Sequence, residues 1–232
     1  MRISYSGISF KIVFDPNRAF SYPLLMRNKK GKTPKNNQSL VYTLLILPVL
    51  CAGLAFTIFA EDCEETVVID DVEYTLPDPW CGQALDSTDI AEPSQLVRLP
   101  DELTFEDYRI YVLPETRDAF VKMAEAAKKD SIDLIADSGF RSPGFQLRII
   151  KRRLERGDSI DDIFHSVAPP GYSQHHTGLA LDLCPSEARF AYSDTYRWLK
   201  ENAAGFGFVE SMPEDRTGGS PWESWHWYYS VK

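Results

Sequence analysis

The stretch "GLALDLC", Gly178 to Cys184, has the two-residue alternation of a β-strand. One face of the strand carries the apolar side chains of Leu179, Leu181 and Leu183. The other face carries small or polar side chains: Ala180, Asp182 and Cys184. Asp182 is unusual, because a lone carboxylate inside an apolar strand is costly unless it has a partner or a metal ion. Two adjacent histidines, His175 and His176, stand just upstream.

The segments around this strand predict a mixed α+β domain. Helix periodicity, caps and stop signals predict helices, and alternation predicts strands. We expect helices over 113–130, 142–157 and 193–205, strands over 131–139, 178–184, 206–211 and 224–231, a hairpin over 66–76 that turns at Asp70-Asp71, and a loop with one helical turn over 159–176. Because helices and strands mix without a regular βαβ repeat, we predict a small, mainly antiparallel sheet with flanking helices.

The charge of −9 is unevenly distributed over the 232 residues. Residues 1–60 carry eight basic residues and one acidic residue, whereas the remainder is strongly acidic. An acidic body argues against a nucleic-acid partner, which would require a basic face.

An uncharged run, "LVYTLLILPVLCAGLAFTIFA" (40–60), has the length of a membrane-spanning helix. Lysines precede it and acidic residues follow it, so the positive-inside rule places the N-terminus in the cytoplasm. The predicted organisation is a basic cytoplasmic segment (1–39), a transmembrane signal-anchor (40–60), an extracytoplasmic annex (61–100) and a main domain (101–232). We expect a single-pass membrane protein, with its main domain on the outer side of the cytoplasmic membrane.

Three features of the N-terminal half remain open. The run 40–60 is either an uncleaved anchor, which we favour, or a signal peptide cut near Ala60. Residues 1–25 have no clear period, and a start at Met26 would leave an ordinary basic lead-in to an export segment. Cys63 and Cys81 either form a disulfide, which an oxidising compartment permits, or are both free. Cys184 is then unpaired.

Spacing brings together a candidate zinc site. His175 lies in the turn that leads into the Asp182 strand, and His226 lies in an aromatic, strand-like stretch, "SWHWYYSV". Two histidines and a carboxylate are typical zinc ligands that leave a position open for water. Glu223 must lie in the turn before the last strand and is the candidate general base for the attacking water. The alternatives are a hydrogen-bonded structural Asp182 and a core histidine at 226.

Three ordered motifs resemble the D-alanyl-D-alanine carboxypeptidase family of the VanY type. Ser-x-His-x-x-Gly-x-Ala-x-Asp is matched by Ser173, His175, Gly178, Ala180 and Asp182; Glu-x-Trp-His by Glu223, Trp225 and His226; and Ser-Gly-aromatic-Arg-Ser followed by Gln by Ser138, Gly139, Phe140, Arg141, Ser142 and Gln146. The resemblance covers about 110–230.

The resemblance implies that His175, Asp182 and His226 bind Zn²⁺ and that Glu223 is the catalytic base. It also implies that Arg141 holds the substrate and polarises the scissile carbonyl, with Gln146 and Ser173 as further substrate-binding residues. The sequence departs from the family pattern at Ser224, where relatives often have proline, and at Tyr228, where they have arginine. Neither residue is a metal ligand.

The implied activity is removal of a C-terminal D-alanine from peptidoglycan stem peptides. The resemblance makes 101–232 a zinc carboxypeptidase domain on the periplasmic side of a bacterial cytoplasmic membrane. Relatives of the same scaffold also include L,D-carboxypeptidases, which act on tetrapeptide stems, and D,D-dipeptidases. An alternative from another class is a non-catalytic module that binds stem peptides and keeps the metal for structure. The sequence gives no indication of the oligomeric state.

Overall fold

The computed structural model describes residues 2–5, 8–11, 64–78, 80–214 and 221–230, which belong to one compact unit. The predicted anchor, 40–60, lies outside these residues, as do most of 1–39 and Cys63. Within the described part of the chain, no helix is long and apolar enough to cross a membrane.

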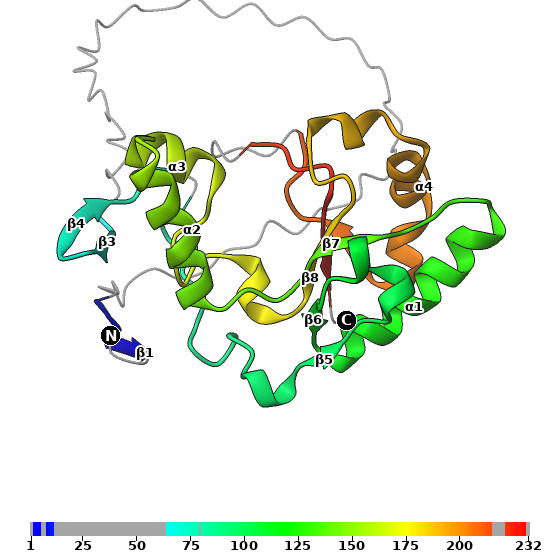
Figure 1. The fold of residues 1–232 in the computed structure, drawn as a ribbon, viewed down its shortest axis with the longest axis horizontal. Helices are drawn as coiled ribbons and strands as arrows, with labels where there is room; N and C mark the ends of the chain where they lie inside the picture. Colours follow the sequence, from blue (N-terminus) through cyan, green and yellow to red (C-terminus); the bar gives the residue numbers. More distant parts are fainter. Residues whose placement is uncertain (1, 6–7, 12–63, 79, 215–220, 231–232) are drawn as a thin grey trace, which may run out of the picture. The chain divides into compact units, whose positions relative to one another are not determined.

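The described residues form four α-helices and ten strands, most of which are labelled in Figure 1. The helices are α1 (Pro114–Lys129), α2 (Pro143–Glu155), α3 (Ile160–Ser166) and α4 (Asp194–Asn202). The strands are β1 (Arg2–Tyr5), β2 (Ile8–Lys11), β3 (Thr66–Ile69), β4 (Val72–Thr75), β5 (Val97–Arg98), β6 (Tyr111–Val112), β7 (Ala136–Ser138), β8 (Ala180–Leu183), β9 (Phe208–Glu210) and β10 (His226–Tyr229).

The central sheet has four strands in the order β7-β8-β10-β9, and all its pairs are antiparallel. Three two-stranded pairs, β1-β2, β3-β4 and β5-β6, complete the strands. Mixed helices around a small antiparallel sheet confirm the predicted α+β class.

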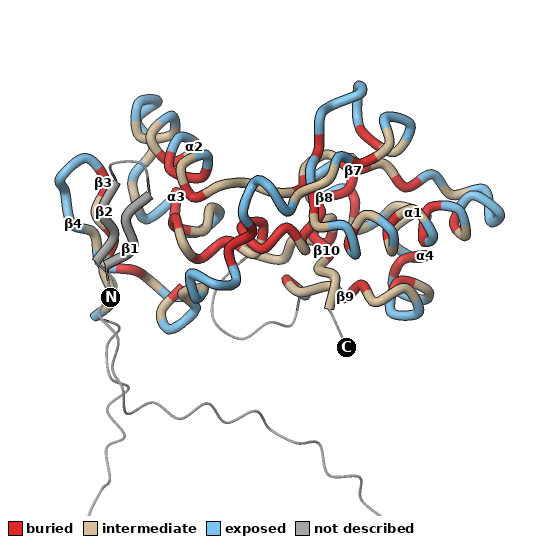
Figure 2. The backbone as a smooth tube through the Cα atoms, turned by 90° about the horizontal axis from the view of Figure 1, so that it is seen from below, coloured by how far each residue is buried: buried red, intermediate tan, exposed pale blue. Residues whose placement is uncertain are grey.

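The register of the sheet separates an apolar face from a polar one. Trp227 of β10 faces Leu181 of β8, and the next pair is His226 opposite Asp182. Because successive side chains alternate across a strand, these two pairs point to opposite faces. Strand β8 is buried throughout, and so are His226 and Trp227 of β10 (Figure 2), so the Asp182 pair is a polar centre inside the protein.

The main core covers the apolar face of this sheet. Helix α1 contributes Phe120 and Met123, and helix α4 contributes Trp198 and Leu199, to one buried cluster with the β8 leucines. The apolar positions of both helices recur at three- and four-residue spacing, which places them on one face. Helices α1 and α4 lie on one side of the central strands in Figure 1, and α2 and α3 lie on the other.

A second core joins the β3–β4 hairpin to helices α2 and α3. Its buried members are Val67, Ile69, Leu76, Trp80, Leu147, Ile150, Ile163, Phe164 and Tyr172. The β3–β4 hairpin turns at Asp70-Asp71 as predicted, and both residues have positive φ, which suits a two-residue hairpin turn. Trp80 also donates from Nε1 to the carbonyl of Phe164 at 2.6 Å.

The structure refines two predicted boundaries. The expected loop over 159–176 contains a two-turn helix, α3, because Ser159 accepts a capping hydrogen bond from the backbone of Asp162. Helix α4 ends at Asn202 and continues as a 3₁₀ segment to Phe206, so the stop is Gly207, with φ of +85°, rather than Gly205. Ser142 and Ser193, the first residues of two predicted helices, cap α2 and α4 by accepting from backbone N–H groups.

Two cysteines lie among the described residues. Cys184 is free, as expected. Cys81 is disulfide-bonded, whereas Cys63, its predicted partner, lies outside the described residues, so that pairing stays a prediction.

Candidate active site

Asp182 and His226 meet because their strands pair in register. The two residues face one another across β8 and β10, and His226 Nδ1 lies 2.9 Å from Asp182 Oδ1. Both side chains are buried. The alternation noted in the sequence therefore delivers a histidine and a carboxylate to one point on the polar face.

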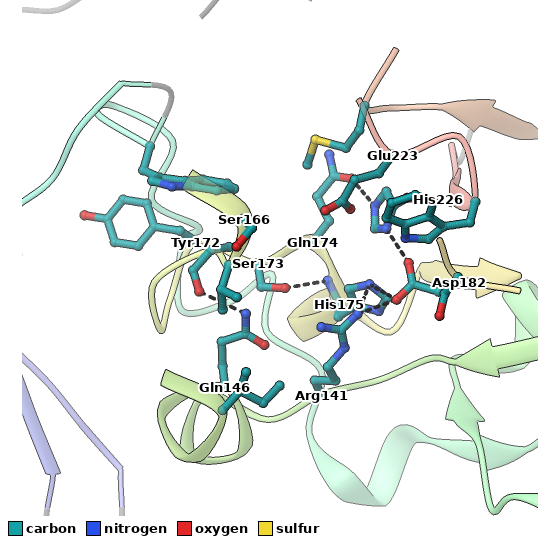
Figure 3. Close-up of a pocket in the computed structure, with 17 residues that line it drawn as sticks. Arg141, Gln146, Ser166, Tyr172, Ser173, Gln174, His175, Asp182, Glu223 and His226 are labelled. Atoms are coloured by element: carbon teal, nitrogen blue, oxygen red, sulfur yellow. Dashed lines mark hydrogen bonds and ion pairs between the residues drawn. The ribbon is translucent and has the colours of Figure 1, made fainter. Parts of the chain in front are cut away.

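His175 reaches the same point from a short 3₁₀ turn, Gln174–Thr177, that precedes β8. The turn ends at Gly178, whose φ of +71° is in the left-handed region that glycine adopts without strain. His175 Nε2 lies 3.2 Å from Asp182 Oδ2. Figure 3 shows both histidines directed at the carboxylate.

The hydrogen bonds of the two histidines fix which ring nitrogens face Asp182. His175 donates from Nδ1 to the carbonyl of Gly139 at 2.7 Å. His226 donates from Nε2 to Gln174 Oε1 at 2.9 Å. The nitrogens that face Asp182 then carry lone pairs, and three acceptors that converge in this way require a cation between them.

The distances suit a zinc ion. Ligand atoms of His175, Asp182 and His226 all lie within 4.8 Å of one another. Zinc–ligand bonds of ~2.0–2.2 Å place two ligands of a tetrahedral ion roughly 3.4 Å apart, close to the 2.9 and 3.2 Å between Asp182 and the two histidines. The types of the three ligand atoms and the distances between them therefore both fit the zinc ion that the sequence predicts.

The protonation states also suit metal ligands. Burial, followed by the Arg141 charge, lowers the pKa of His175 to about 4, so this ring is neutral at neutral pH. Burial alone would raise the pKa of Asp182. The positive charge of Arg141 beside the carboxyl outweighs that effect and holds the pKa of Asp182 well below its usual value.

Arg141 supplies the positive charge that these acceptors face. Its Nη2 forms an ion pair with Asp182 and lies 2.7 Å from His175 Nε2. A metal ion would compete with this guanidinium for the same two acceptors. The predicted role of Arg141 on the substrate thus requires the guanidinium to turn toward the pocket when a metal binds. That movement would break the contacts of Nη2, including its 3.2 Å hydrogen bond to Ser138 Oγ, whereas the buried Nε has no hydrogen-bond partner among the described residues.

Glu223 lies where the sequence predicts, just before the turn that leads into β10. The His226 N–H donates to the Glu223 carbonyl at 2.9 Å, which closes that turn. The side chain of Glu223 lines the same pocket as the three candidate ligands, beside His226 in Figure 3. A carboxylate in this position can exchange a proton with a water molecule near the metal position.

The pocket beside these residues has a volume of about 230 Å³. Gln146 and Ser173, the predicted substrate residues, both line it. Gln146 donates to the carbonyl of Ala168 at 2.9 Å, while its buried Oε1 has no partner in the described part of the chain. Ser173 caps the turn that carries His175, accepting from the His175 N–H at 3.4 Å.

Two residues that support the site were not predicted from the sequence. Gln174 accepts from His226 and also from Ser211, whose Oγ lies 2.6 Å from Oε1. His176 is fully buried behind Arg141: its Nδ1 donates to the Arg141 carbonyl at 2.5 Å and its Nε2 accepts from the Gly171 N–H at 3.1 Å. The contacts of Gln174 with Ser211 and His226, and that of His176 with Arg141, join segments far apart in sequence, so no local pattern signals them.

Comparison with curated proteins finds similar bacterial chains. YodJ of Bacillus subtilis is 33% identical over 153 residues, which are 61% of this chain and 55% of that protein. A D-alanyl-D-alanine carboxypeptidase of Enterococcus faecalis is 31% identical over 130 residues, 52% of this chain and 47% of its own length. The chain thus spans about half the length of these curated relatives.

Solved structures share the fold. The LdcB LD-carboxypeptidase aligns with a TM-score of 0.56 and 34% identity over 64% of this chain and 73% of its own. VanYB in complex with D-alanine-D-alanine aligns with a TM-score of 0.51 and 25% identity over 67% and 85%. The family model described as VanY, D-alanyl-D-alanine carboxypeptidase, matches residues 109–232. The chain therefore belongs to the VanY family of D-alanyl-D-alanine carboxypeptidases.

Proposed function

We propose that this chain is a zinc-dependent carboxypeptidase that removes a C-terminal D-alanine from peptidoglycan stem peptides. The observation that carries the proposal is the convergence of His175, Asp182 and His226, with a pocket-lining carboxylate, Glu223, beside them. Two histidines and one carboxylate leave a coordination position open, as in catalytic zinc sites. Zinc held there would supply a Lewis acid that polarises a carbonyl and acidifies water.

The remaining steps belong to the side chains of this protein. Glu223 takes the proton of the attacking water and returns it to the leaving amine of the C-terminal residue. Arg141, turned from Asp182 toward the pocket, stabilises the negative charge that develops on the scissile carbonyl oxygen. Gln146 Oε1, which lacks a partner among the described residues, is available to accept from a peptide N–H, with Ser173 on the same wall.

We place the reaction outside the cytoplasmic membrane. Stem peptides belong to the cell wall, and the run 40–60 has the length and flanking charges of an anchor. A bonded Cys81 agrees with an oxidising compartment.

An L,D-carboxypeptidase activity on tetrapeptide stems is the second candidate. It is favoured by the likeness to LdcB, which is described as an LD-carboxypeptidase. A non-catalytic module that binds stem peptides has less support, because such a module would have no need of Glu223 beside the metal ligands.

The test mixes the full-length protein and zinc with pentapeptide and tetrapeptide stems and follows the products by mass spectrometry. We expect loss of one alanine from the pentapeptide alone. Loss from the tetrapeptide would assign the L,D activity to the same site. Two intact stems in the presence of bound zinc would contradict the carboxypeptidase proposal.

A further inference from the structure

A second and larger hollow adjoins the catalytic pocket. We call it the outer hollow; it has a volume of about 730 Å³ and shares Arg141, Ile149, Asp182 and Ser186 with the pocket. Pockets that enclose a whole small ligand measure roughly 300–1,000 Å³. The catalytic pocket, at about 230 Å³, is below that range, so it has room for the end of a peptide, and the rest of the chain must leave through a neighbouring space.

Exposed aromatic side chains line the outer hollow. Tyr108 and Tyr111, on the segment that leads into and begins β6, are 49% and 41% exposed, and Phe145 in the first turn of α2 is 44% exposed. Phe105 packs edge-on against Tyr108, with ring centroids 5.7 Å apart. Aromatic groups that gather around a hollow, rather than scattering singly, indicate a binding surface.

Two arginines without an ion pair stand on the same walls. Arg109 and Arg148 are exposed, line the outer hollow and form no ion pair with any described residue. The guanidinium of Arg148 lies 5.1 Å from the centroid of the Phe145 ring, a cation–π contact that holds it against the wall. In a protein of net charge −9, unpaired cations beside the active site point to an anionic ligand.

The acidic groups of the outer hollow do not cancel this charge. Asp182 is paired with Arg141 and the two histidines. Asp137, the middle residue of β7, accepts a hydrogen bond from Ser186. With Arg141 paired to Asp182, the remaining charges are Arg109 and Arg148 against Asp137, which leaves a net positive wall.

We infer that the outer hollow binds the part of the peptide substrate that precedes the scissile bond, and that it selects peptides carrying a carboxylate there. This inference rests on the proposed function, because a carboxypeptidase takes the C-terminal residue into its small pocket and leaves the chain before it outside. The aromatic rings pack on the apolar parts of that chain, and a guanidinium pairs bidentately with its carboxylate.

The test uses the full-length zinc-loaded protein and two acetylated tetrapeptides. The peptides are acetyl-Glu-Lys-D-Ala-D-Ala and acetyl-Gln-Lys-D-Ala-D-Ala, so they differ only in the carboxylate of the first residue. The variant is the double substitution Arg109→Gln and Arg148→Gln, and Arg156→Ala is the matched control, because Arg156 is an exposed arginine at the end of α2 that lines neither space.

We expect the ratio of kcat/KM for the glutamate peptide to that for the glutamine peptide to fall roughly tenfold in the double variant, mainly through KM. The control should keep the wild-type ratio. An unchanged ratio in the double variant, or an equal fall in the control, would overturn the inference.

A binding measurement separates this inference from the proposed function. The two peptides are titrated by calorimetry into a Glu223→Ala protein, with and without the arginine substitutions. We expect the arginine substitutions to weaken binding of the glutamate peptide roughly tenfold more than binding of the glutamine peptide. That result supports carboxylate selection by the outer hollow even if the wild type cleaves neither peptide. If the substitutions weaken binding of both peptides equally, or of neither, the inference is overturned even if cleavage is efficient.

Discussion

The catalytic pocket and the outer hollow meet at Arg141, yet they differ in how their polar side chains are bonded and how far they are buried. In the pocket, Asp182 and both histidines are buried, and each of them contacts Arg141, Gln174 or a backbone carbonyl. In the outer hollow, aromatic rings and two arginines are exposed and unpaired with any described carboxylate. The candidate metal ligands lie on paired strands and a capped turn, whereas the recognising groups lie on the segment that leads into β6 and on a face of α2.

This difference separates chemistry from selection. Groups that must be held within a fraction of an ångström benefit from a rigid sheet and from supporting hydrogen bonds. Groups that meet a variable substrate can stay exposed until it arrives. Substitutions in the pocket should therefore change metal binding or kcat, and substitutions in the outer hollow should change KM and peptide preference.

Among substitutions that leave the metal ligands in place, the largest effect is expected of Glu223→Gln. Loss of a general acid–base group lowers kcat by roughly 10²- to 10⁴-fold. Zinc content should stay at the wild-type value, because the metal ligands are His175, Asp182 and His226. Alanine release by mass spectrometry and metal analysis on the same sample check both parts. Glu214→Gln, an exposed carboxylate outside the pocket, is the control, and full activity of Glu223→Gln would show that the base is wrongly assigned.

A second prediction concerns the buried support behind Arg141. Burial lowers the pKa of His176 to about 4 from its ordinary 6.5. As pH falls below about 6.5, the unfolded chain binds a proton there that the folded chain rejects until about pH 4. The free energy of unfolding should therefore decrease over this range, with a His176 contribution of up to about 3 kcal/mol.

Denaturant titrations of metal-free protein between pH 7 and pH 4 measure this slope. The variant His176→Gln, which has no titrating ring, should show a shallower loss of stability with falling pH, whatever its stability at pH 7. If the free energy of unfolding fell equally with pH in the wild type and the variant, buried neutral His176 would not be a source of the pH dependence.

A third and smaller effect is expected at Gln174. Its Oε1 accepts from His226 Nε2 and so keeps Nδ1 free for the metal. Loss of such a supporting acceptor typically lowers metal affinity 10- to 100-fold. Chelator competition should show this loss for Gln174→Leu, whereas Gln174→Glu, which keeps an acceptor, should retain zinc. Equal affinity of the leucine variant and the wild type would exclude the supporting role.

The residues that touch the metal position could be predicted because each is marked by a local pattern. The alternation around Asp182 reveals a polar residue on a buried strand, and the spacing of Glu223 and His226 places one in a turn and the other on the strand. Three ordered motifs then tied these segments to one family. The strand pairing that sets His226 opposite Asp182 supplies the three-dimensional reason.

The supporting contacts could not be predicted in the same way. The Gln174–Ser211 bond spans 37 residues, and the bond from His176 to the Arg141 carbonyl spans 35. Such contacts depend on how loops pack in three dimensions. Helix α3 was expected as a single turn because its seven residues are too few for a clear period, whereas its cap and its packing against α2 extend it.

The central claim is that one zinc ion held by His175, Asp182 and His226 is required for hydrolysis. The most direct measurement determines the zinc content and the rate of alanine release for the full-length wild type and for Asp182→Asn, before and after treatment with a chelator. We predict one zinc per chain and activity in the wild type, loss of both with the chelator, recovery when zinc is restored, and neither in Asp182→Asn. Undiminished hydrolysis by metal-free wild type, or by an Asp182→Asn protein without zinc, would contradict the claim.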